Sequence, residues 1–444
     1  MFPPGPQGGL FLGSLRDIRR DPLAFLSRVS AEYGDIAHFK LGPFNVFLLN
    51  HPDNIEQVLV THQHRFIKGR SLSGARRLFG NGLLTSDGAV HGCQRRLVQP
   101  VFHRARLDEY AGVMTTLAVE CRDTWRDGDI IDIAGEMSRL TLRITGRILF
   151  GRDGDAVAAE IREPLEDATN LLEIPVLPFS ALTDRLPLPR VRRFNTARAT
   201  IDRVVNDLVA CRRLDPGDRG DVVSLLMSAH SDMGGEPMSD VQLRDEIVTL
   251  LLASHETTAN ALAWTWYLLA RHADAEARLH AEIDTVLGTG DVPSGGDLPE
   301  LPYARRVLAE SMRLYPPAWL LARVAVEEHE ARGYVIPPGS LVVLSPWVVH
   351  RNRVYFPDPE RFEPERWRAA THNSRPRFSY FPFGGGSRGC MGEAFAWMEG
   401  TLLLAVIARR WRFRLLEESS HPAIRPALTL TPRSGIPVRI ARRA

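Results

Sequence analysis

Hydrophobic positions recur at helical spacing along most of the chain and alternate at strand spacing only in short segments. The longest helical pattern predicts a buried helix over 240–271. Further helices are predicted at about 22–32, 52–61, 89–100, 107–127, 136–150, 155–173, 190–212, 219–230, 273–288, 301–314 and 391–410. Strands are predicted at 35–41, 44–50, 322–327, 334–336 and 341–344, with strand and turn character over 412–442. The pattern therefore predicts a mainly α fold with a minor β part.

Composition supports an ordinary globular protein. The chain has 444 residues, 44% hydrophobic and 24% charged, which excludes a disordered, collagen-like or coiled-coil chain. A net charge of +2 gives no support for a nucleic-acid or anionic-membrane partner. The basic residues include only two lysines, Lys40 and Lys68. That bias is typical of a GC-rich bacterial genome, so many arginines reflect composition.

The apolar stretch 247–270 is long enough to span a membrane, but His255, Glu256 and Asn260 interrupt it. A charged residue at mid-bilayer is costly, so we interpret the stretch as a buried core helix. The N-terminus has neither a charged segment nor a long apolar run, so no signal peptide is expected. We therefore expect a soluble, cytoplasmic protein without a membrane anchor.

Four scattered cysteines exclude a disulfide-rich scaffold and a zinc ribbon, and Cys390 stands out among them. It lies in a glycine-rich window, 383–392, directly before a predicted helix. Backbone N–H groups at a helix start, together with Arg388, favour a thiolate that acts as a nucleophile or a metal ligand. The window lacks the Gly-Lys-Ser/Thr ending of a phosphate loop, and it comes too late in the chain for a dinucleotide fingerprint.

The spacing Phe-x-x-Gly-x-Arg-x-Cys-x-Gly at 383–392 resembles the haem-binding loop of the cytochrome P450 family. The resemblance implies one domain over 1–444, with haem b between a long central helix and the helix after the cysteine. It implies that Cys390 is the axial thiolate ligand of the iron. Arg388 would pair with a haem propionate, Phe383 would shield the sulfur, and Gly384 would let the backbone approach the haem edge. The β-rich parts would be about 35–50, 322–344 and 412–442.

Two upstream segments also match the family. Glu310 and Arg313 fit its Glu-x-x-Arg element on one helix face, before a stop at Pro316. Residues 359–362, Pro-Glu-Arg-Phe, resemble a second element, in which Arg361 would complete a buried Glu310–Arg313–Arg361 triad. Buried ion clusters contribute little net stability, so we assign this triad to folding and haem incorporation.

Polar residues at 253–258 interrupt the long apolar helix and need a reason, because unsatisfied polar groups are costly in a core. The resemblance makes this the oxygen-activation stretch, with Ala253 beside the haem and Glu256 and Thr257 as the acid–alcohol pair that delivers protons. The alternative is a set of satisfied core hydroxyls. Ser254 stands where the family usually has glycine, and its hydroxyl is expected to bond back to a carbonyl and bend the helix.

Three further residues are candidates for the haem propionates. Residues 91–95 align with the family's Trp-x-x-x-Arg, with His91 in place of tryptophan and Arg95 retained. Both side chains can donate to a carboxylate, although a surface position is the alternative for His91. Arg323 is a further candidate by its position after an apolar run.

The resemblance implies a monooxygenase that inserts one oxygen atom from O2 by hydroxylation or epoxidation. A lipophilic substrate is expected: a bacterial terpenoid or polyketide, or a fatty acid. The chain shows no flavin motif after Cys390, so electrons from NAD(P)H would arrive through a ferredoxin or flavodoxin and its reductase. Arginines near the cysteine loop and Arg95 and Arg96 would form the docking face of a monomeric enzyme. A peroxide-driven peroxygenase, a haem sensor and an electron carrier are the alternatives; the pair Glu256 and Thr257 argues against the peroxygenase.

The substrate pocket is expected to be apolar and without a charged anchor. By family position it draws on segments 66–88, 170–182, 249–257, 317–322 and 427–431. The lining residues we select are Leu83, Leu252, Ala253, Ala318, Trp319, Leu320, Leu428 and Leu430. Plain core packing is the alternative for each of them.

Overall fold

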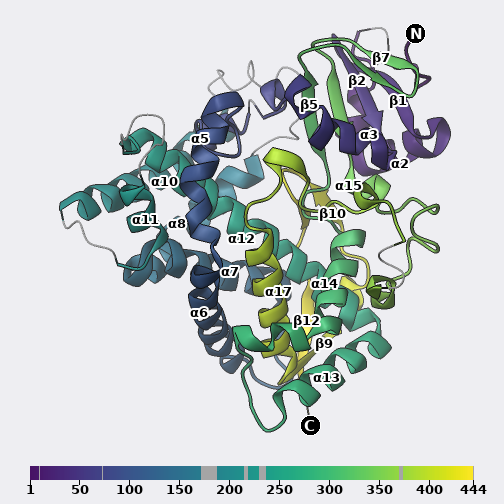
Figure 1. Cartoon of the computed structure of the whole chain (residues 1–444). Helices are drawn as coiled ribbons and strands as arrows, with labels where there is room; N and C mark the ends of the chain where they lie inside the picture. The colour runs from purple at the N-terminus through teal and green to yellow at the C-terminus, as the bar shows by residue number, and fades with distance from the viewer. Residues whose placement is uncertain are drawn as a thin grey trace.

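The computed structural model describes residues 1–9, 11–72, 74–171, 188–214, 219–229, 237–369 and 374–443. Over these residues the chain is mainly helical with small β-sheets, which confirms the predicted fold class. Figure 1 shows the β-rich part, built from the N-terminal segment and β5 to β8, at one corner of the molecule, with helices forming the remainder.

The helices follow the predicted pattern with small shifts at their ends. They are α1 (Leu15–Arg20), α2 (Pro22–Tyr33), α3 (Pro52–Glu56), α4 (Arg76–Phe79), α5 (Gly88–Val98), α6 (Arg104–Asp123), α7 (Ile133–Phe150), α8 (Gly154–Leu171), α10 (Pro189–Leu214), α11 (Val222–Ser228), α12 (Asp240–Arg271), α13 (Ala273–Leu287), α14 (Pro302–Leu314), α15 (Pro346–Val349) and α17 (Glu393–Ala408). The predicted helix 52–61 is divided, because a π-helical turn, Gln57–Thr61, follows α3. The helices α1, α4 and α15 were not predicted, since four to six residues carry too little periodicity.

Local signals explain where the main helices begin. The side chain of Asp21 accepts a hydrogen bond from Ala24 N at 3.0 Å and caps α2, which has Pro22 in its first turn. The hydroxyl of Ser239 accepts from Gln242 N at 3.2 Å and caps the 32-residue α12. These two helix starts agree with the sequence prediction.

The largest sheet joins segments from opposite ends of the chain. Its order is β1 (Ile36–Leu41), β2 (Phe44–Leu49), β8 (Leu341–Leu344), β5 (Leu321–Ala325) and β3 (Phe66–Ile67). The pair β2 and β8 is parallel, with Val46 opposite Leu341, and the other pairs are antiparallel. A two-stranded ladder, β6 (His329–Ala331) and β7 (Tyr334–Ile336), extends this lobe.

The C-terminal segment forms two smaller β units. One is a three-stranded sheet of β4 (Ile130–Asp132), β12 (Pro437–Arg442) and β9 (Trp411–Leu415). The other is the antiparallel hairpin of β10 (Ile424–Pro426) and β11 (Leu430–Pro432), which lies against α12. This hairpin becomes important for the site below.

The largest hydrophobic core lies among the helices, where α12 packs against α7, α14 and α17. Two smaller cores lie on the two faces of the five-stranded sheet. Because α12 is packed on all these neighbours, its side chains are mostly buried. Among the described residues, no helix has the length and apolarity needed to cross a membrane.

Candidate functional site

The loop before α17 has a backbone that glycine alone adopts easily. Gly384 and Gly386 have φ of +70° and +69°, in the left-handed region. A Cβ on Gly386 would lie 1.8 Å from the carbonyl oxygen of Leu59. The Cys390 N–H donates to the Phe383 carbonyl at 2.9 Å and closes the loop. The glycines of the motif therefore let the loop turn tightly against the 57–63 segment.

Two side chains from outside, Gln63 and Arg95, hold this loop, and the loop residue Arg388 reaches outwards. The Gln63 amide oxygen accepts from Ser387 N at 2.9 Å and from Ser387 Oγ at 2.6 Å. Arg388 Nη1 donates to the Gln63 carbonyl at 3.2 Å. Arg95 Nη1, on α5, donates to the Gly389 carbonyl at 2.8 Å. The sequence analysis did not identify Gln63, because nothing in its local sequence indicates a contact more than 300 residues away.

Cys390 lies two residues before Gly392, the N-cap of α17, and solvent reaches its side chain. Burial of its surroundings raises the pKa of the thiol to about 11, while the Gly392 N–H and the charge of Arg95 act in the opposite direction. A metal ion that binds the sulfur displaces this proton.

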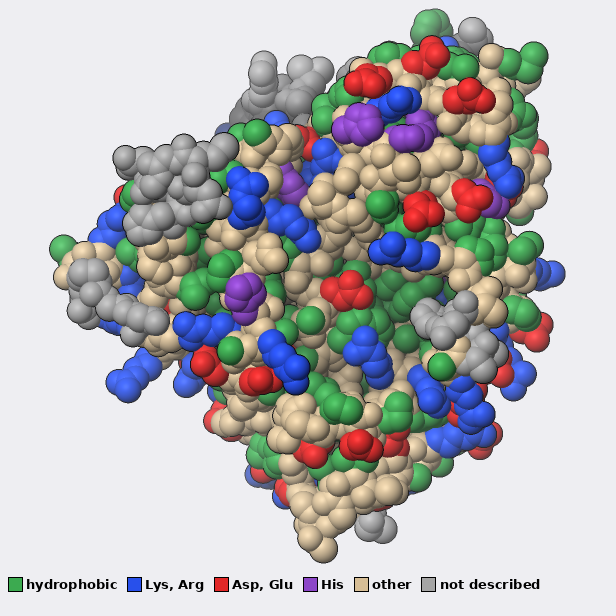
Figure 2. Space-filling model, viewed as in Figure 1, with side chains coloured by type: hydrophobic (Ala, Val, Ile, Leu, Met, Phe, Trp, Pro, Cys, Tyr) green, Lys and Arg blue, Asp and Glu red, His purple; other side chains and the backbone are tan. Residues whose placement is uncertain are grey.

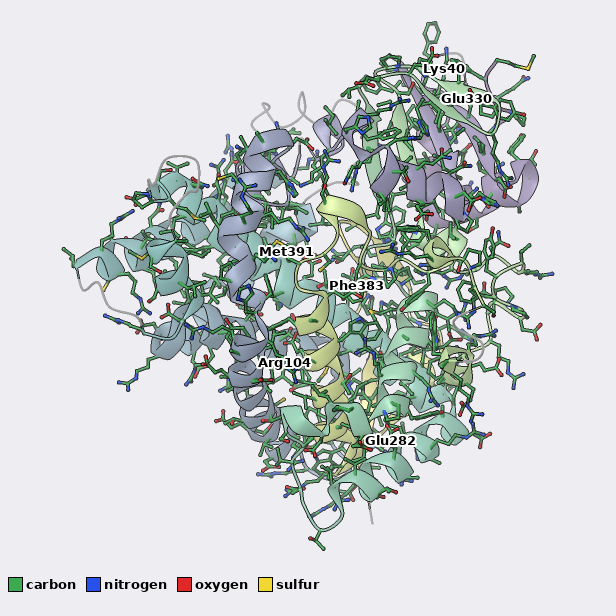
Figure 3. All side chains as sticks on the ribbon, in the orientation of Figure 1. Lys40, Arg104, Glu282, Glu330, Phe383 and Met391 are labelled. Atoms are coloured by element: carbon green, nitrogen blue, oxygen red, sulfur yellow. The ribbon has the colours of Figure 1, made fainter. Side chains whose placement is uncertain are left out.

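An aromatic pair lies beside the loop. The ring centroids of Phe383 and Trp397 are 5.6 Å apart, and the Arg305 guanidinium lies 4.4 Å from the Trp397 centroid. Figure 3 shows Phe383 and Met391 on the two sides of the loop at the start of α17. The Phe383 ring thus packs on Trp397 of α17, and its backbone carbonyl accepts from the Cys390 N–H.

The donor set around Cys390 suits a metal that brings its own ligands. Within the described ranges, no group of three or more His, Cys, Asp and Glu side chains could hold a metal ion. A single thiol can supply one axial ligand to an iron held by a porphyrin. The residues present at Cys390 therefore fit haem.

Basic side chains gather around one carboxylate near the loop. The Asp87 carboxylate lies 3.5 Å from Arg388 Nη2 and accepts from the backbone N–H of Lys68 at 3.0 Å, and its charge acts on the side chains of Lys68 and Arg323. Burial, followed by neighbouring cations, lowers the pKa of Lys68 to about 7, of His91 to about 4 and of Arg323 to about 10. We call Lys68, His91, Arg323 and Arg388 the cationic cluster; near neutral pH its charge comes from Arg323, Arg388 and part of Lys68, because His91 is then neutral. Its excess positive charge suits the two carboxylates of a haem.

The structure adds to the prediction at two members of the cationic cluster. His91 is only 6% exposed, so the structure excludes the surface alternative. Lys68 was not selected at all, although it is one of only two lysines in an arginine-rich chain. Its Nζ donates to the Leu83 carbonyl at 2.8 Å. The rarity of lysine in this chain was the one sequence feature that could have singled out Lys68.

The predicted triad is partly wrong. Arg313 Nε donates to Glu310 Oε2 at 2.9 Å, and both side chains are fully buried. The third member is Arg366, whose Nε donates to Glu310 Oε1 at 3.1 Å, whereas the Arg361 side chain is exposed. Arg361 contributes its backbone carbonyl, which accepts from Arg313 Nη2 at 3.1 Å. The sequence repeats Pro-Glu-Arg at 359–361 and 364–366, and the second copy lies in the 3-10 helix Pro364–Trp367 packed on α14.

The interrupted stretch of α12 contains an accessible residue. Ala253 is exposed between buried turns of the helix, and Thr257, one turn later, is half-buried. Ser254 Oγ donates to the Leu250 carbonyl at 2.6 Å, as expected, and lies 3.3 Å from Thr145 Oγ1. Thr257 Oγ1 donates to the Ala253 carbonyl at 2.7 Å. A face of α12 with a hydroxyl is therefore open to a small molecule.

Glu256 is held by the C-terminal hairpin. Thr429 Oγ1 donates to Glu256 Oε1. Burial raises the pKa of Glu256, while the hydrogen bond from Thr429 and the charge of Arg425 lower it. Neither Thr429 nor Arg425 was selected from the sequence, since hairpin residues carry no local sign of a contact with α12.

The selected pocket residues fall into two groups. Solvent reaches part of Leu83, Ala253, Ala318, Leu320 and Leu428. Leu252, Trp319 and Leu430 are buried within the hydrophobic cores. Of the expected segment 170–182, residues 172–182 lie outside the described residues.

Comparisons with known proteins agree with this geometry. The family model described as Cytochrome P450 matches residues 3–438. The chain is 44% identical to Cyclooctatin synthase of Streptomyces melanosporofaciens, over 97% of this chain and 94% of that protein. It is 37% identical to Cyclooctat-9-en-7-ol 5-monooxygenase of the same organism, over 91% and 87%. The crystal structure of the cytochrome P450DA heme domain superposes with a TM-score of 0.89, at 25% identity, over 100% and 98%. The chain belongs to the cytochrome P450 family.

Proposed function

We propose that this chain is a haem-thiolate monooxygenase that inserts one oxygen atom from O2 into a lipophilic, terpenoid-like small molecule. The observation that carries the proposal is the Glu256–Thr257 pair beside the accessible Ala253 on α12. Two relatives with nearly full coverage bear names built on cyclooctatin and cyclooctat-9-en-7-ol, and these names support a terpenoid substrate.

When bound, haem b supplies the oxidation chemistry, with electrons that originate in NAD(P)H. The residues of this chain would hold it at three places: Cys390 at the iron, Arg323 and Arg388 at the carboxylates. Phe383 excludes water from the side of the sulfur. The protein thereby orients the cofactor and controls its exposure to solvent.

The polar pair on α12 handles protons. Thr257 presents a hydroxyl that can donate or accept, and the Glu256 carboxyl holds a proton more readily than an exposed carboxyl because burial raises its pKa. Leu83, Ala318, Leu320 and Leu428 offer apolar surface to the substrate. The substrate is thus oriented by shape, while protons are delivered from the helix.

Electrons are proposed to come from a ferredoxin or flavodoxin with its reductase. Figure 2 shows basic side chains over α5 and beside the cysteine loop on the face that carries α17. Such a face favours an acidic partner, and raising the salt concentration should slow electron transfer. We propose further that the enzyme acts as a cytoplasmic monomer.

The test is an optical titration of the purified ferric protein with panels of terpenes, fatty acids and macrocycles. A saturable low-to-high-spin shift with terpenes, followed by oxygen consumption and a product one oxygen heavier, supports the proposal. Product formed with hydrogen peroxide in place of reductase and O2 would identify a peroxygenase instead. No haem spectrum after haem supplementation would reject the whole proposal.

A further inference from the structure

Glu256 and Thr257 both lie on α12, but the Glu256 carboxyl is held by the β10–β11 hairpin. Glu256 Oε1 accepts from Thr429 Oγ1 on the β10–β11 hairpin. Thr429 Oγ1 in turn accepts from Asn260 Nδ2 at 3.1 Å, one turn further along α12. Thr429 and Asn260 are 5% and 7% exposed. The orientation of the Glu256 carboxyl is therefore set by the hairpin.

The turn that carries Thr429 is fixed on both sides. Trp319 Nε1 donates to the Ala427 carbonyl, and Trp264 Nε1 donates to the Leu430 carbonyl, each at 3.0 Å. The Leu430 N–H donates to the Pro317 carbonyl at 3.1 Å. Two buried indoles thus hold the residues that flank Thr429, and its hydroxyl has little freedom to leave Glu256.

The other end of the hairpin leads towards solvent. Arg425, on β10, is half-buried, and its Nε donates to Thr431 Oγ1 at 3.2 Å. The charge of Arg425 lowers the pKa of Glu256, and the exposed Arg433 lies close enough to affect Arg425. The hairpin therefore gives Glu256 a hydroxyl partner inside and positive charge at the solvent side.

The same turn carries Leu428 and Leu430, which were selected as pocket residues on either side of Thr429. Leu428 is partly reached by solvent. A substrate packed on Leu428 would press on the turn that orients Glu256. Substrate binding and proton delivery would then share one structural element.

We propose that Thr429 is the positioning residue for Glu256, and that protons reach Glu256 along the β10–β11 hairpin past Arg425. This inference rests on the proposed monooxygenase function. A monooxygenase takes up two electrons and two protons per O2, places one oxygen in the product and releases the other as water. The Glu256 carboxyl gives up its proton, the hydrogen bond from Thr429 to Oε1 keeps the group in place, and solvent at Arg425 returns the proton.

The test compares Thr429→Val with Thr429→Ser in the haem-loaded protein. The first readout is the infrared band of the Glu256 carboxyl, identified as the band that Glu256→Gln removes. Without the hydroxyl, only the charge of Arg425 opposes the effect of burial, so Thr429→Val should raise the titration midpoint by about one pH unit, while Thr429→Ser should keep it. Arg425→Gln should raise it as well, and Arg425→Lys should not.

The second readout is coupling, the fraction of the NAD(P)H electrons that end in product and not in hydrogen peroxide. Thr429→Val should form product about tenfold more slowly and release more hydrogen peroxide per NAD(P)H, with an unchanged substrate spin shift. Thr429→Ser should restore coupling. An unshifted carboxyl band in Thr429→Val, or equal coupling in both variants, would overturn the proposal. If the native protein oxidises no terpenoid, the proposed function fails, but the infrared titration still tests the contact between Thr429 and Glu256.

Discussion

Two buried clusters of charge in this molecule have opposite organisations. Around Glu310, one carboxylate accepts from Arg313, Arg366 and the Trp367 indole at 2.9–3.1 Å, so its lone pairs are satisfied by the protein. In the cationic cluster, Asp87 faces several basic groups whose pKa values are lowered by burial and by one another. A cluster whose charges are paired within the protein has a structural role, whereas a cluster with a surplus of one charge favours binding of a ligand with the opposite charge.

The largest expected effect comes from removing the charge at the centre of the first cluster. Glu310→Gln leaves Arg313 buried with an incomplete partner, so the free energy of unfolding should fall by about 3–5 kcal/mol. Urea unfolding measures this change. Glu330→Gln, at an exposed residue of β6 labelled in Figure 3, is the matched control and should change little. A native-like stability of Glu310→Gln would contradict the structural role.

The two Pro-Glu-Arg copies provide a sharper test of the same cluster. Arg366→Ala should lower the free energy of unfolding by about 3 kcal/mol, because Glu310 loses a buried partner. Arg361→Ala should stay within about 0.5 kcal/mol, since its side chain is exposed and its contribution is a backbone carbonyl. Thermal and urea unfolding of both variants decide the point. A larger loss of stability in Arg361→Ala than in Arg366→Ala would support the Glu310–Arg313–Arg361 triad expected from the sequence.

Lys68 tests the second cluster through pH. Its pKa is about 7 in the fold, against 10.5 for an unperturbed lysine, so between these values the unfolded chain binds a proton that the folded chain does not. Stability should therefore rise with pH there, by about 2 kcal/mol from pH 7 to about pH 9, relative to Lys68→Met. Urea unfolding of the haem-depleted protein at several pH values measures the slope. Parallel curves for the two proteins would contradict it.

The smallest expected effect comes from Arg323→Leu, which should change haem binding without changing the stability of the haem-depleted protein. Arg323→Leu should leave the haem-depleted protein as stable as the native one, because it removes a cation from a crowded cluster. The loaded variant should lose haem about tenfold faster to a scavenger protein, because one charge-assisted contact is missing. Absorbance at the Soret band follows the transfer. Equal haem loss in the two proteins would remove Arg323 from the binding site.

The sequence by itself determined the longer helices, the main strands and the family to which the cysteine loop belongs. The cap at Asp21, the long apolar period of 240–271 and the glycines of 383–392 are local signals, and each requires only neighbouring residues. These elements were predicted within a few residues of their observed ends. The same local patterns correctly indicated a mainly helical fold.

The tertiary structure alone decided the pairings that define the site. It selected Arg366 over Arg361 at Glu310, brought the Lys68 ammonium within reach of the charge of Asp87, and placed Thr429 on Glu256. The contact between Thr429 and Glu256 joins residues 173 positions apart. Such pairings depend on how helices and sheets pack. The spacing of hydrophobic residues along the chain does not indicate which distant side chain will contact a given residue. The helices and strands are therefore determined by local sequence, while the partners of the buried charges are determined by tertiary packing.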